Sequence, residues 1–301
     1  MSYTTKSALF VFIIISSLLS CSKADLTAPA NANTEQNFSE DFSITASGDR
    51  FLSKVLYEDY TGAWCGWCPR IAYKFDLMME HNPDRFLMQG NHNGDAFTTP
   101  YQSNLESTFK IQGFPTGWEN RYQAFKDNGN IMNLSDTVNK WSYLKTLDSL
   151  GLSITSSIAS NKVSGIVKVG FGYSFSSKVK LVIELLEDSL VLAQANYYNL
   201  FPTGNPYYGM GNTMNNFVHR NVLRKCATNE LGDLIPAIST NAGNEYSLSY
   251  NFDLAGFKAS RCKVVAFVVY ETGQSKSGII NVQWTKAGKD KGYDKVVKHK
   301  L

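Results

Sequence analysis

The apolar residues of this chain follow two different spacings. Between residues 50 and 151, strand-like apolar runs alternate with segments in which apolar residues recur every three or four positions, as on one face of a helix. Beyond Gly151 the helical spacing disappears, and short apolar runs are separated by turn-forming residues. The pattern therefore predicts an α/β unit followed by an all-β unit.

The expected elements follow from run length and from the residues that bound each run. In the first unit we expect strands over 51–60, 85–91 and 118–125, and helices over 71–82, 101–109 and 135–150. In the second unit we expect strands over 152–159, 163–172, 179–186, 191–198, 217–226, 246–254, 262–270 and 279–284. Many short strands separated by turns are typical of a β-sandwich.

A chain of 301 residues is long enough for two domains, each with its own core. We expect a signal peptide over 1–20, a tether over 21–49, an α/β domain over 50–151, a β-sandwich domain over 152–287 and a basic tail over 288–301. The tether is assigned because Ala, Asn, Ser and Thr dominate there, so that the segment cannot bury enough apolar surface to fold.

The N-terminal segment has the features of an export signal. Lys6 precedes an apolar run over 8–19 that is too short to span a bilayer. Leu18-Leu19-Ser20-Cys21 resembles a bacterial lipobox, in which signal cleavage leaves a lipid-modified cysteine as the first mature residue. We therefore expect a protein of the cell envelope, anchored by a lipid on Cys21 at the outer membrane of a Gram-negative bacterium. A soluble secreted protein is the alternative.

Charge argues against nucleic acid as a partner. Hydrophobic residues make up 43% of the chain and charged residues 18%, as in an ordinary globular protein. The net charge is +3, but residues 286–301 alone hold six lysines and two aspartates, a charge of +4. The rest of the chain is thus near neutral, whereas a nucleic-acid-binding domain carries its basic residues on a folded face.

Cys65 and Cys68 lie at the turn between the first expected strand and the first expected helix. Cysteines separated by two residues can form, open and exchange a disulfide. The unpaired N–H groups and the positive dipole end of a helix favour the thiolate, most of all at the outer Cys65, and Pro69 suits the first helical turn. The pair predicts redox chemistry. A static disulfide is the alternative, and a zinc site is disfavoured because no second close cysteine pair exists.

The motif Trp64-Cys65-Gly66-Trp67-Cys68-Pro69 resembles the active site of the thioredoxin superfamily. Asp59, six residues before Cys65, is similar to the buried carboxylate of that family, and Gly113-Phe114-Pro115-Thr116 is similar to its loop with a cis proline. The separation of Pro115 from Cys65, 50 residues, also suits that fold. The resemblance implies an α/β thioredoxin-like fold for the N-terminal domain.

The same resemblance implies roles for individual residues. Cys65 would attack a substrate disulfide, Cys68 would resolve the mixed disulfide, Asp59 would manage the proton and Pro115 would shape the groove. Substrate contacts are implied for Trp64, Gly66, Trp67, Phe114 and Thr116. By strand alternation, Asp59 shares a face with Val55 and Tyr57, which predicts that its carboxylate points inward. The alternative for the carboxylate is a surface-facing Asp59, with Glu58 as the competing candidate.

The mature chain also resembles a family of Bacteroidota outer-membrane lipoproteins that pairs a thioredoxin-like half with a β-sandwich. The residues that carry this resemblance are 58–62, 92–95, 219–224 and 281–284. Members of that family are described mostly by location. The resemblance therefore implies architecture and place more than activity.

The other candidate residues carry weaker signals. Cys226 and Cys262 are expected to form a structural disulfide in an oxidising compartment, and two buried free thiols are the alternative. No metal site and no cofactor is predicted. For His92 and Asp95, hydrogen bonding within their loop is favoured over a catalytic role. The loop over 199–216, rich in Tyr and Met, is expected to fold onto its own sandwich, with a recognition surface as the alternative.

Two functions remain. The first is a cell-envelope thiol-disulfide oxidoreductase, a reductase or isomerase, which acts on protein disulfides and takes electrons from a donor that the sequence does not identify. The second is a non-catalytic outer-membrane surface or binding lipoprotein that uses the α/β domain as a scaffold. The enzyme is favoured because each step of exchange matches a residue that is present.

Overall fold

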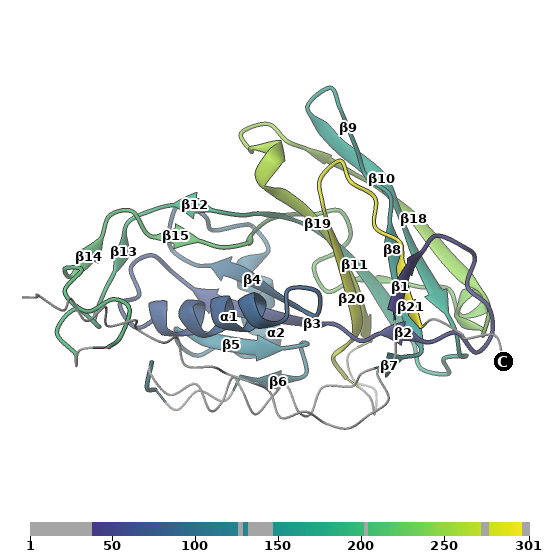
Figure 1. Ribbon diagram of the computed structural model, residues 1–301, viewed down its shortest axis with the longest axis horizontal. Helices are drawn as coiled ribbons and strands as arrows, with labels where there is room; N and C mark the ends of the chain where they lie inside the picture. The colour runs from purple at the N-terminus through teal and green to yellow at the C-terminus, as the bar shows by residue number, and fades with distance from the viewer. Residues whose placement is uncertain (1–37, 126–128, 132–146, 202–203, 272–276, 297–301) are drawn as a thin grey trace, which may run out of the picture. The chain divides into compact units, whose positions relative to one another are not determined.

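A mixed nine-stranded sheet runs through the structure (Figure 1). The computed structural model describes residues 38–125, 129–131, 147–201, 204–271 and 277–296. The strand order is β20 (Ile279–Lys286), β19 (Cys262–Tyr270), β11 (Val179–Glu187), β16 (Val222–Cys226), β4 (Phe86–His92), β3 (Val55–Thr61), β5 (Thr116–Glu119) and β6 (Gln123–Ala124), with β17 (Asp233–Leu234) paired to β11. Strands from both halves of the chain therefore share one sheet.

The parallel strands β3 and β4 are buried on both faces. All seven residues of each strand are buried, as expected for parallel strands that are covered on both sides. Helix α1 (Pro69–His81) connects them and packs Ile71 and Phe75 against one face. Helix α2 (Gln102–Phe109) contributes Leu105 to the core on the other face. The end of β3 and the start of α1 thus place the Cys65–Cys68 turn at the edge of this sheet.

The predicted fold class, an α/β thioredoxin-like domain followed by a separate β-sandwich, is wrong. The described part of the chain is mostly β and contains only α1 and α2 as α-helices. The contact between β16 and β4 joins the two halves: Val222 pairs with Gly90, whose N–H donates to the carbonyl of Asn221 at 3.1 Å. The described residues between 38 and 296 belong to one compact unit. The free edge that a separate domain would have at β4 is therefore occupied by a strand from the second half.

The third expected helix, over 135–150, is also wrong at its C-terminal end. Residues 132–146 lie outside the described residues, but Leu147–Asp148 (β7) and Leu150–Ile154 (β8) are strands. All residues of β8 are buried, and its apolar side chains pack as part of a sheet and not along one face of a helix. Within the described ranges, no helix has both the length and the apolar character needed to cross a membrane.

A second sheet covers the β11–β19 part of the first. It consists of β18 (Glu245–Asp253), β10 (Lys162–Phe171) and β8, with β9 (Ser157–Ala159) paired to β10. The inward residues of both sheets form one apolar core, in which Val167 and Phe171 of β10 pack with Leu181 and Val264. The packing of two sheets face to face agrees with the sandwich expected for the second half of the chain.

A third, small sheet uses both ends of the described chain. Its order is β1 (Phe38–Asp41), β21 (Tyr293–Val296), β2 (Phe51–Leu52) and β7. The tether predicted over 21–49 is therefore wrong from Phe38 onward, and the basic tail predicted over 288–301 is wrong at β21, since both segments pair with each other. These strands are only two or four residues long, which is too short for a sequence pattern to indicate a sheet.

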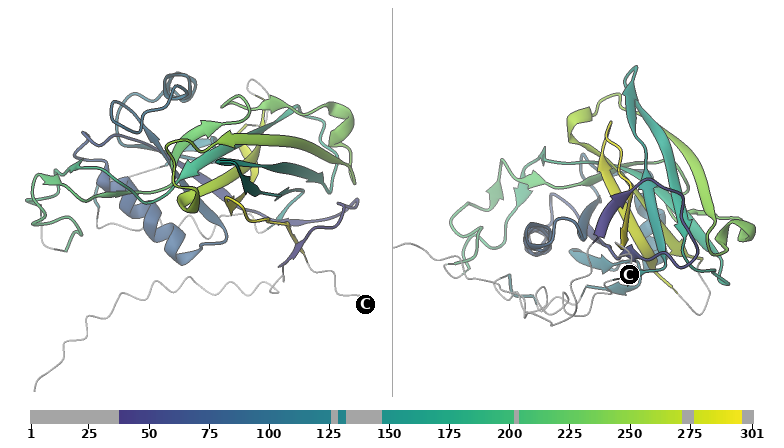
Figure 2. Two further views of the ribbon diagram at one scale, coloured as in Figure 1. Left: turned by 90° about the horizontal axis from the view of Figure 1, so that it is seen from above. Right: turned by 45° about the vertical axis from the view of Figure 1, so that its right-hand side comes forward.

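Residues 190–201 and 204–219 lie outside the large sheet, between β11 and β16. We call this segment the arm. Its elements are β12 (Leu190–Val191), β13 (Gln194–Ala195), β14 (Thr213–Met214) and β15 (Val218–His219), paired as β12–β15 and β13–β14. Figures 1 and 2 show that the arm extends along α1 toward the end of that helix where the Cys65–Cys68 turn lies. The strand expected over 191–198 is thus two short pieces outside the sandwich.

Candidate functional site

Cys65 and Cys68 form a disulfide at the start of α1. Cys68 occupies the N-cap position and Pro69 the first helical position, as the sequence predicted. The turn is closed by backbone hydrogen bonds, from the N–H of Cys65 to the carbonyl of Gly62 and from the N–H of Cys68 to the carbonyl of Cys65. The disulfide therefore lies on a fixed turn at the positive end of the helix.

The two cysteines are buried. Cys65 is 5% exposed and Cys68 is 1% exposed. In this conformation the outer cysteine is therefore almost inaccessible to solvent. The arm is the covering element: the N–H of Ala195 donates to the carbonyl of Ala63 at 2.8 Å, and the Nε2 group of Gln194 donates to the carbonyl of Cys65 at 2.8 Å.

Tyr197 completes the cover. Its N–H donates to the carbonyl of Gly66 at 3.0 Å, and its ring lies so close to Gly66 that an added Cβ would be 2.3 Å from it. Trp67 packs among three arm residues, with ring centroids 5.2 Å from Tyr197, 5.4 Å from Tyr198 and 5.6 Å from Phe201. Glycine at position 66 is therefore required for the arm to lie flat on the turn.

Asp59 points inward, as predicted from strand alternation. Its side chain is buried, and among the described residues neither carboxylate oxygen has a hydrogen-bond partner. Burial, with a smaller contribution from the negative charge of Asp76, raises the pKa of Asp59 well above its ordinary value. Glu58, the competing candidate, faces the opposite side of the sheet and pairs with Arg121. The carboxyl group of Asp59 is thus harder to ionise than that of an ordinary aspartate.

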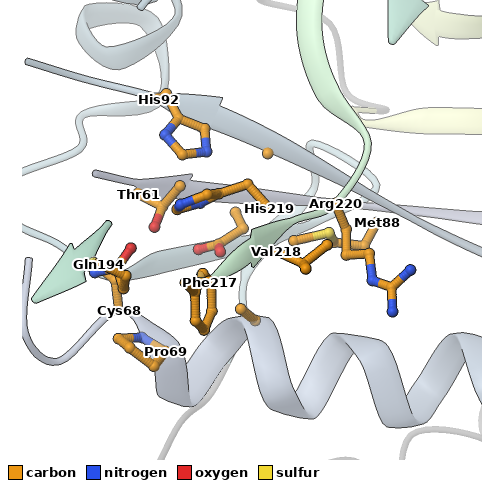
Figure 3. Close-up of a pocket in the computed structure, with 13 residues that line it drawn as sticks. Thr61, Cys68, Pro69, Met88, His92, Gln194, Phe217, Val218, His219 and Arg220 are labelled. Carbon is orange, nitrogen blue, oxygen red and sulfur yellow. The ribbon is translucent and has the colours of Figure 1, made fainter. Parts of the chain in front are cut away.

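Asp59 and Cys68 line the same small cavity, of about 10 Å³, which is close to the space that one water molecule needs. Thr61, His92, Gln194 and His219 are among its other polar lining residues. Figure 3 shows Cys68 and Pro69 at the end of α1, with Gln194 and Phe217 of the arm beside them. The carboxyl group of Asp59 therefore borders the same small cavity as the inner cysteine.

His92 and Asp95 form a hydrogen-bonded pair, with His92 Nδ1 2.7 Å from Asp95 Oδ2, as expected for their loop. The same oxygen accepts the N–H of Ala63, which ties the pair to the cystine turn. Burial disfavours the charged form of Asp95, but its hydrogen bonds outweigh burial and lower its pKa. His219 packs on His92 with centroids 4.9 Å apart, and burial together with His92 lowers the pKa of His219 to about 4.

The peptide bond between Phe114 and Pro115 is cis, as predicted. The Phe114 ring packs against Trp64, with centroids 5.5 Å apart, and the Trp64 Nε1 group donates to the carbonyl of Asn93 at 2.8 Å. Thr116 begins β5, and its hydroxyl donates to the carbonyl of Gly113 at 2.7 Å. The residues predicted to contact substrate thus lie around the cystine turn, but two of them, Gly66 and Trp67, are in contact with arm residues.

Two hollows meet at Trp67, and we call them together the aromatic groove. One, of about 340 Å³, is lined by Trp67, Arg70, Phe114, Pro115 and Gly129. The other, of about 450 Å³, is lined by Trp67, Gly129, Asn130, Ile131, Tyr198, Phe201 and Asn205. The Trp67 ring is 40% exposed and Phe201 is 45% exposed. The groove is therefore an open surface of the size that binding sites have, apolar mainly on its Phe201 side and bordered by the charged Arg70 on the other.

The structural disulfide predicted between Cys226 and Cys262 is wrong. Both are free thiols. They lie on strands on opposite sides of β11, where Cys226 pairs with Glu184 and Cys262 with Glu187. Cys262 faces the core between the two sheets and Cys226 packs on the other face, so their side chains point apart. Burial raises the pKa of Cys262 to about 11, which favours an unreactive thiol.

The arm residues were the part of the site that sequence reasoning missed. Gln194 and Tyr197 lie in a range predicted as a sandwich strand, and only the aromatic content of the loop over 199–216 pointed to recognition. Nothing in the local sequence links Gln194 to Cys65, which is 129 positions away. Within the described ranges, no group of three or more His, Cys, Asp or Glu side chains is placed to hold a metal ion.

Comparison with solved structures identifies proteins of similar fold. The structure is similar to that of HBP35 of Porphyromonas gingivalis, with a TM-score of 0.61 over 79% of this chain and 76% of that chain, at 19% sequence identity. A protein of Agrobacterium tumefaciens is similar with a TM-score of 0.46 over 82% of this chain and 97% of that chain, at 11% identity, which is too remote to support an argument. Among curated proteins, none matches the sequence.

The resemblance to the thioredoxin superfamily is corrected here, since the matching family is a different one. The model of the family described as outer membrane protein Omp28 matches residues 102–291, which is more than half of the 301 residues. The predicted location at the outer membrane is therefore confirmed, and the chain belongs to the Omp28 family of outer membrane proteins.

Proposed function

We propose that this outer membrane protein is a non-catalytic binding protein, and that its aromatic groove receives an extended apolar peptide segment of another envelope protein. The observation that carries the proposal is the groove itself. Exposed apolar patches on soluble domains mark interaction sites, and grooves lined by aromatic rings are a recurring way to bind extended chains. The burial of the disulfide beside the groove supports a structural role for the cystine in this function.

Phe201→Ala should weaken peptide binding about tenfold, because the ring forms one wall of the groove and aromatic anchors dominate such interfaces. The measurement is selection of phage-displayed 12-residue peptides on the immobilised full chain, followed by titration of the selected peptides. The matched control is Ile238→Ala, on η1 (Ala237–Thr240), an exposed apolar residue that does not line the groove. Failure to select related peptides, or equal loss in both variants, would rule the proposal out.

A second candidate function, thiol–disulfide exchange on envelope proteins, is favoured by one specific observation. The buried carboxyl of Asp59 and Cys68 line the same small cavity. In exchange, the Cys65 thiolate attacks one sulfur of a substrate disulfide and releases the other as a thiolate. The ionised form of Asp59, whose pKa is raised by burial, then accepts the proton of Cys68, and the Cys68 thiolate displaces the substrate from Cys65.

If this exchange occurs, Cys68→Ala should leave substrate proteins covalently attached to Cys65, because the step that releases them is lost. The expected result is a set of adducts on non-reducing gels of whole cells that disappear on reduction. The double variant that also carries Cys65→Ser is the control and should form none. A Cys68→Ala protein without adducts would exclude this candidate and leave the binding function in place.

A further inference from the structure

The arm contacts the cystine turn in the way that an added strand would. Alternate arm residues, Ala195 and Tyr197, donate backbone hydrogen bonds to the carbonyls of Ala63 and Gly66. Backbone pairing of this kind is how an extended peptide adds to an exposed edge. The arm therefore occupies the backbone positions of the turn with a segment of the same chain.

The contacts of the arm also seal the disulfide. Gln194, itself buried, donates from one amide group to the carbonyls of Cys65 at 2.8 Å and Gly62 at 3.3 Å. The Tyr197 ring lies directly over Gly66. Attack on a disulfide requires a thiolate to reach one sulfur in line with the bond. With the cysteines this deeply buried, such an approach requires the arm to move.

The arm is built as a unit that can move without unfolding the sheets. The side chain of Asn196 holds the arm's own backbone, with bonds to the carbonyls of Tyr207 at 3.0 Å and Gly211 at 2.9 Å. Its strands are only two residues long, and Leu200 near its tip is 85% exposed. Elements with short strands and exposed side chains open at a small fraction of the free energy of global unfolding.

We propose that the arm is a displaceable cover, and that its opening sets the rate at which the Cys65–Cys68 disulfide can be reduced. Only the biological purpose of this device rests on the second candidate function. In the reaction with dithiothreitol, one thiolate bonds to Cys65 and Cys68 leaves as a thiolate. The second thiolate then displaces Cys65, so that two electrons and two protons pass to the cysteines and the reagent becomes a cyclic disulfide.

The test is the rate of this reduction in the full chain, followed by alkylation with N-ethylmaleimide and mass spectrometry of the peptide that holds both cysteines. Gln194→Ala and Tyr197→Ala should each speed reduction about tenfold, since each removes hydrogen bonds or packing that hold the arm closed. Tyr208→Ala, an exposed arm residue without a contact to the turn, is the control and should leave the rate unchanged.

A second measurement decides the matter even if a variant fails to fold. In the wild-type protein, amide hydrogen exchange at Ala195 and Tyr197 should be faster than in β11, because the arm opens while the sheets stay intact. Reduction only at the rate of global unfolding, or equal rates in all variants, would overturn the proposal. Faster reduction in the variants without any adducts on Cys65 in cells would uphold the cover and reject the redox function.

Discussion

Replacing Arg121 with Met should lower the free energy of unfolding by about 3–5 kcal/mol, because it leaves two buried acidic side chains without their shared cation. The guanidinium of Arg121 donates to Glu58 at 2.9 Å and lies 3.5 Å from Glu184. All three side chains are buried in the large sheet. A further donation from Arg121 to the carbonyl of Glu230, at 2.7 Å, fixes the β5–β6 turn against the sheet.

The loss of unfolding free energy in the Arg121→Met variant should depend on pH. Burial, partly offset by Arg121, raises the pKa of Glu184 to about 8, so this carboxyl already holds its proton at neutral pH. Without the cation, the pKa of Glu184 should rise further, and the variant should be least unstable below about pH 4, where carboxyl groups are protonated even in the unfolded chain. Urea unfolding at pH 4 and pH 8 measures this difference.

Two further variants complete this experiment. Glu58→Gln in the Arg121→Met background should recover part of the lost stability, because one buried charge is removed. Arg50→Met is the matched control: Arg50 is exposed, lies 4.5 Å over the Tyr173 ring, and should contribute less than about 1 kcal/mol. A loss below about 1 kcal/mol in Arg121→Met would show that the cluster does not depend on its cation.

The parts of this fold that sequence reasoning identified are those specified by local pattern. The apolar runs that became β3 and β4 and the helical spacing of α1 have their origin in neighbouring residues. The direction of Asp59 followed from alternation in a single strand. Pro115 and the Cys65–Cys68 pair are short motifs whose geometry depends on a few adjacent residues. For such features no knowledge of the rest of the chain is needed.

The parts that were missed depend on pairing between distant segments. The apolar sequence of β16 suits a strand of the sandwich as well as a strand paired with β4. The sequence pattern alone does not indicate which strand β16 pairs with. Arg121 follows Asn120 in a turn where both residues have positive φ, a conformation that Arg rarely adopts. The role of Arg121 follows only from the folded sheet, in which Glu58 and Glu184 lie next to its guanidinium group.

Replacing Asp59 with Asn should make the protein more stable, and the gain should grow as the pH rises. Because burial raises the pKa of Asp59 above its unfolded value, the folded protein binds this proton more tightly than the unfolded chain. Wild-type stability is therefore lost as the pH rises from the unfolded pKa, near 4, toward the raised folded pKa. Over that pH range, the difference in free energy of unfolding between the Asn variant and the wild type should widen by about 1.4 kcal/mol per pH unit.

The measurement is urea unfolding of both proteins between pH 4 and pH 8, with exposed Asp84→Asn as the control for loss of an ordinary carboxylate. Asp76 on α1 and His219 across the cavity also titrate near Asp59, and both are present in both proteins. Curves that stay parallel across this range would show that Asp59 ionises as freely in the folded protein as in the unfolded chain. Widening curves would instead identify a carboxyl group that destabilises the fold at neutral pH. Retention of such a group beside Cys68 would be explained by proton transfer, since packing alone is better served by a neutral side chain.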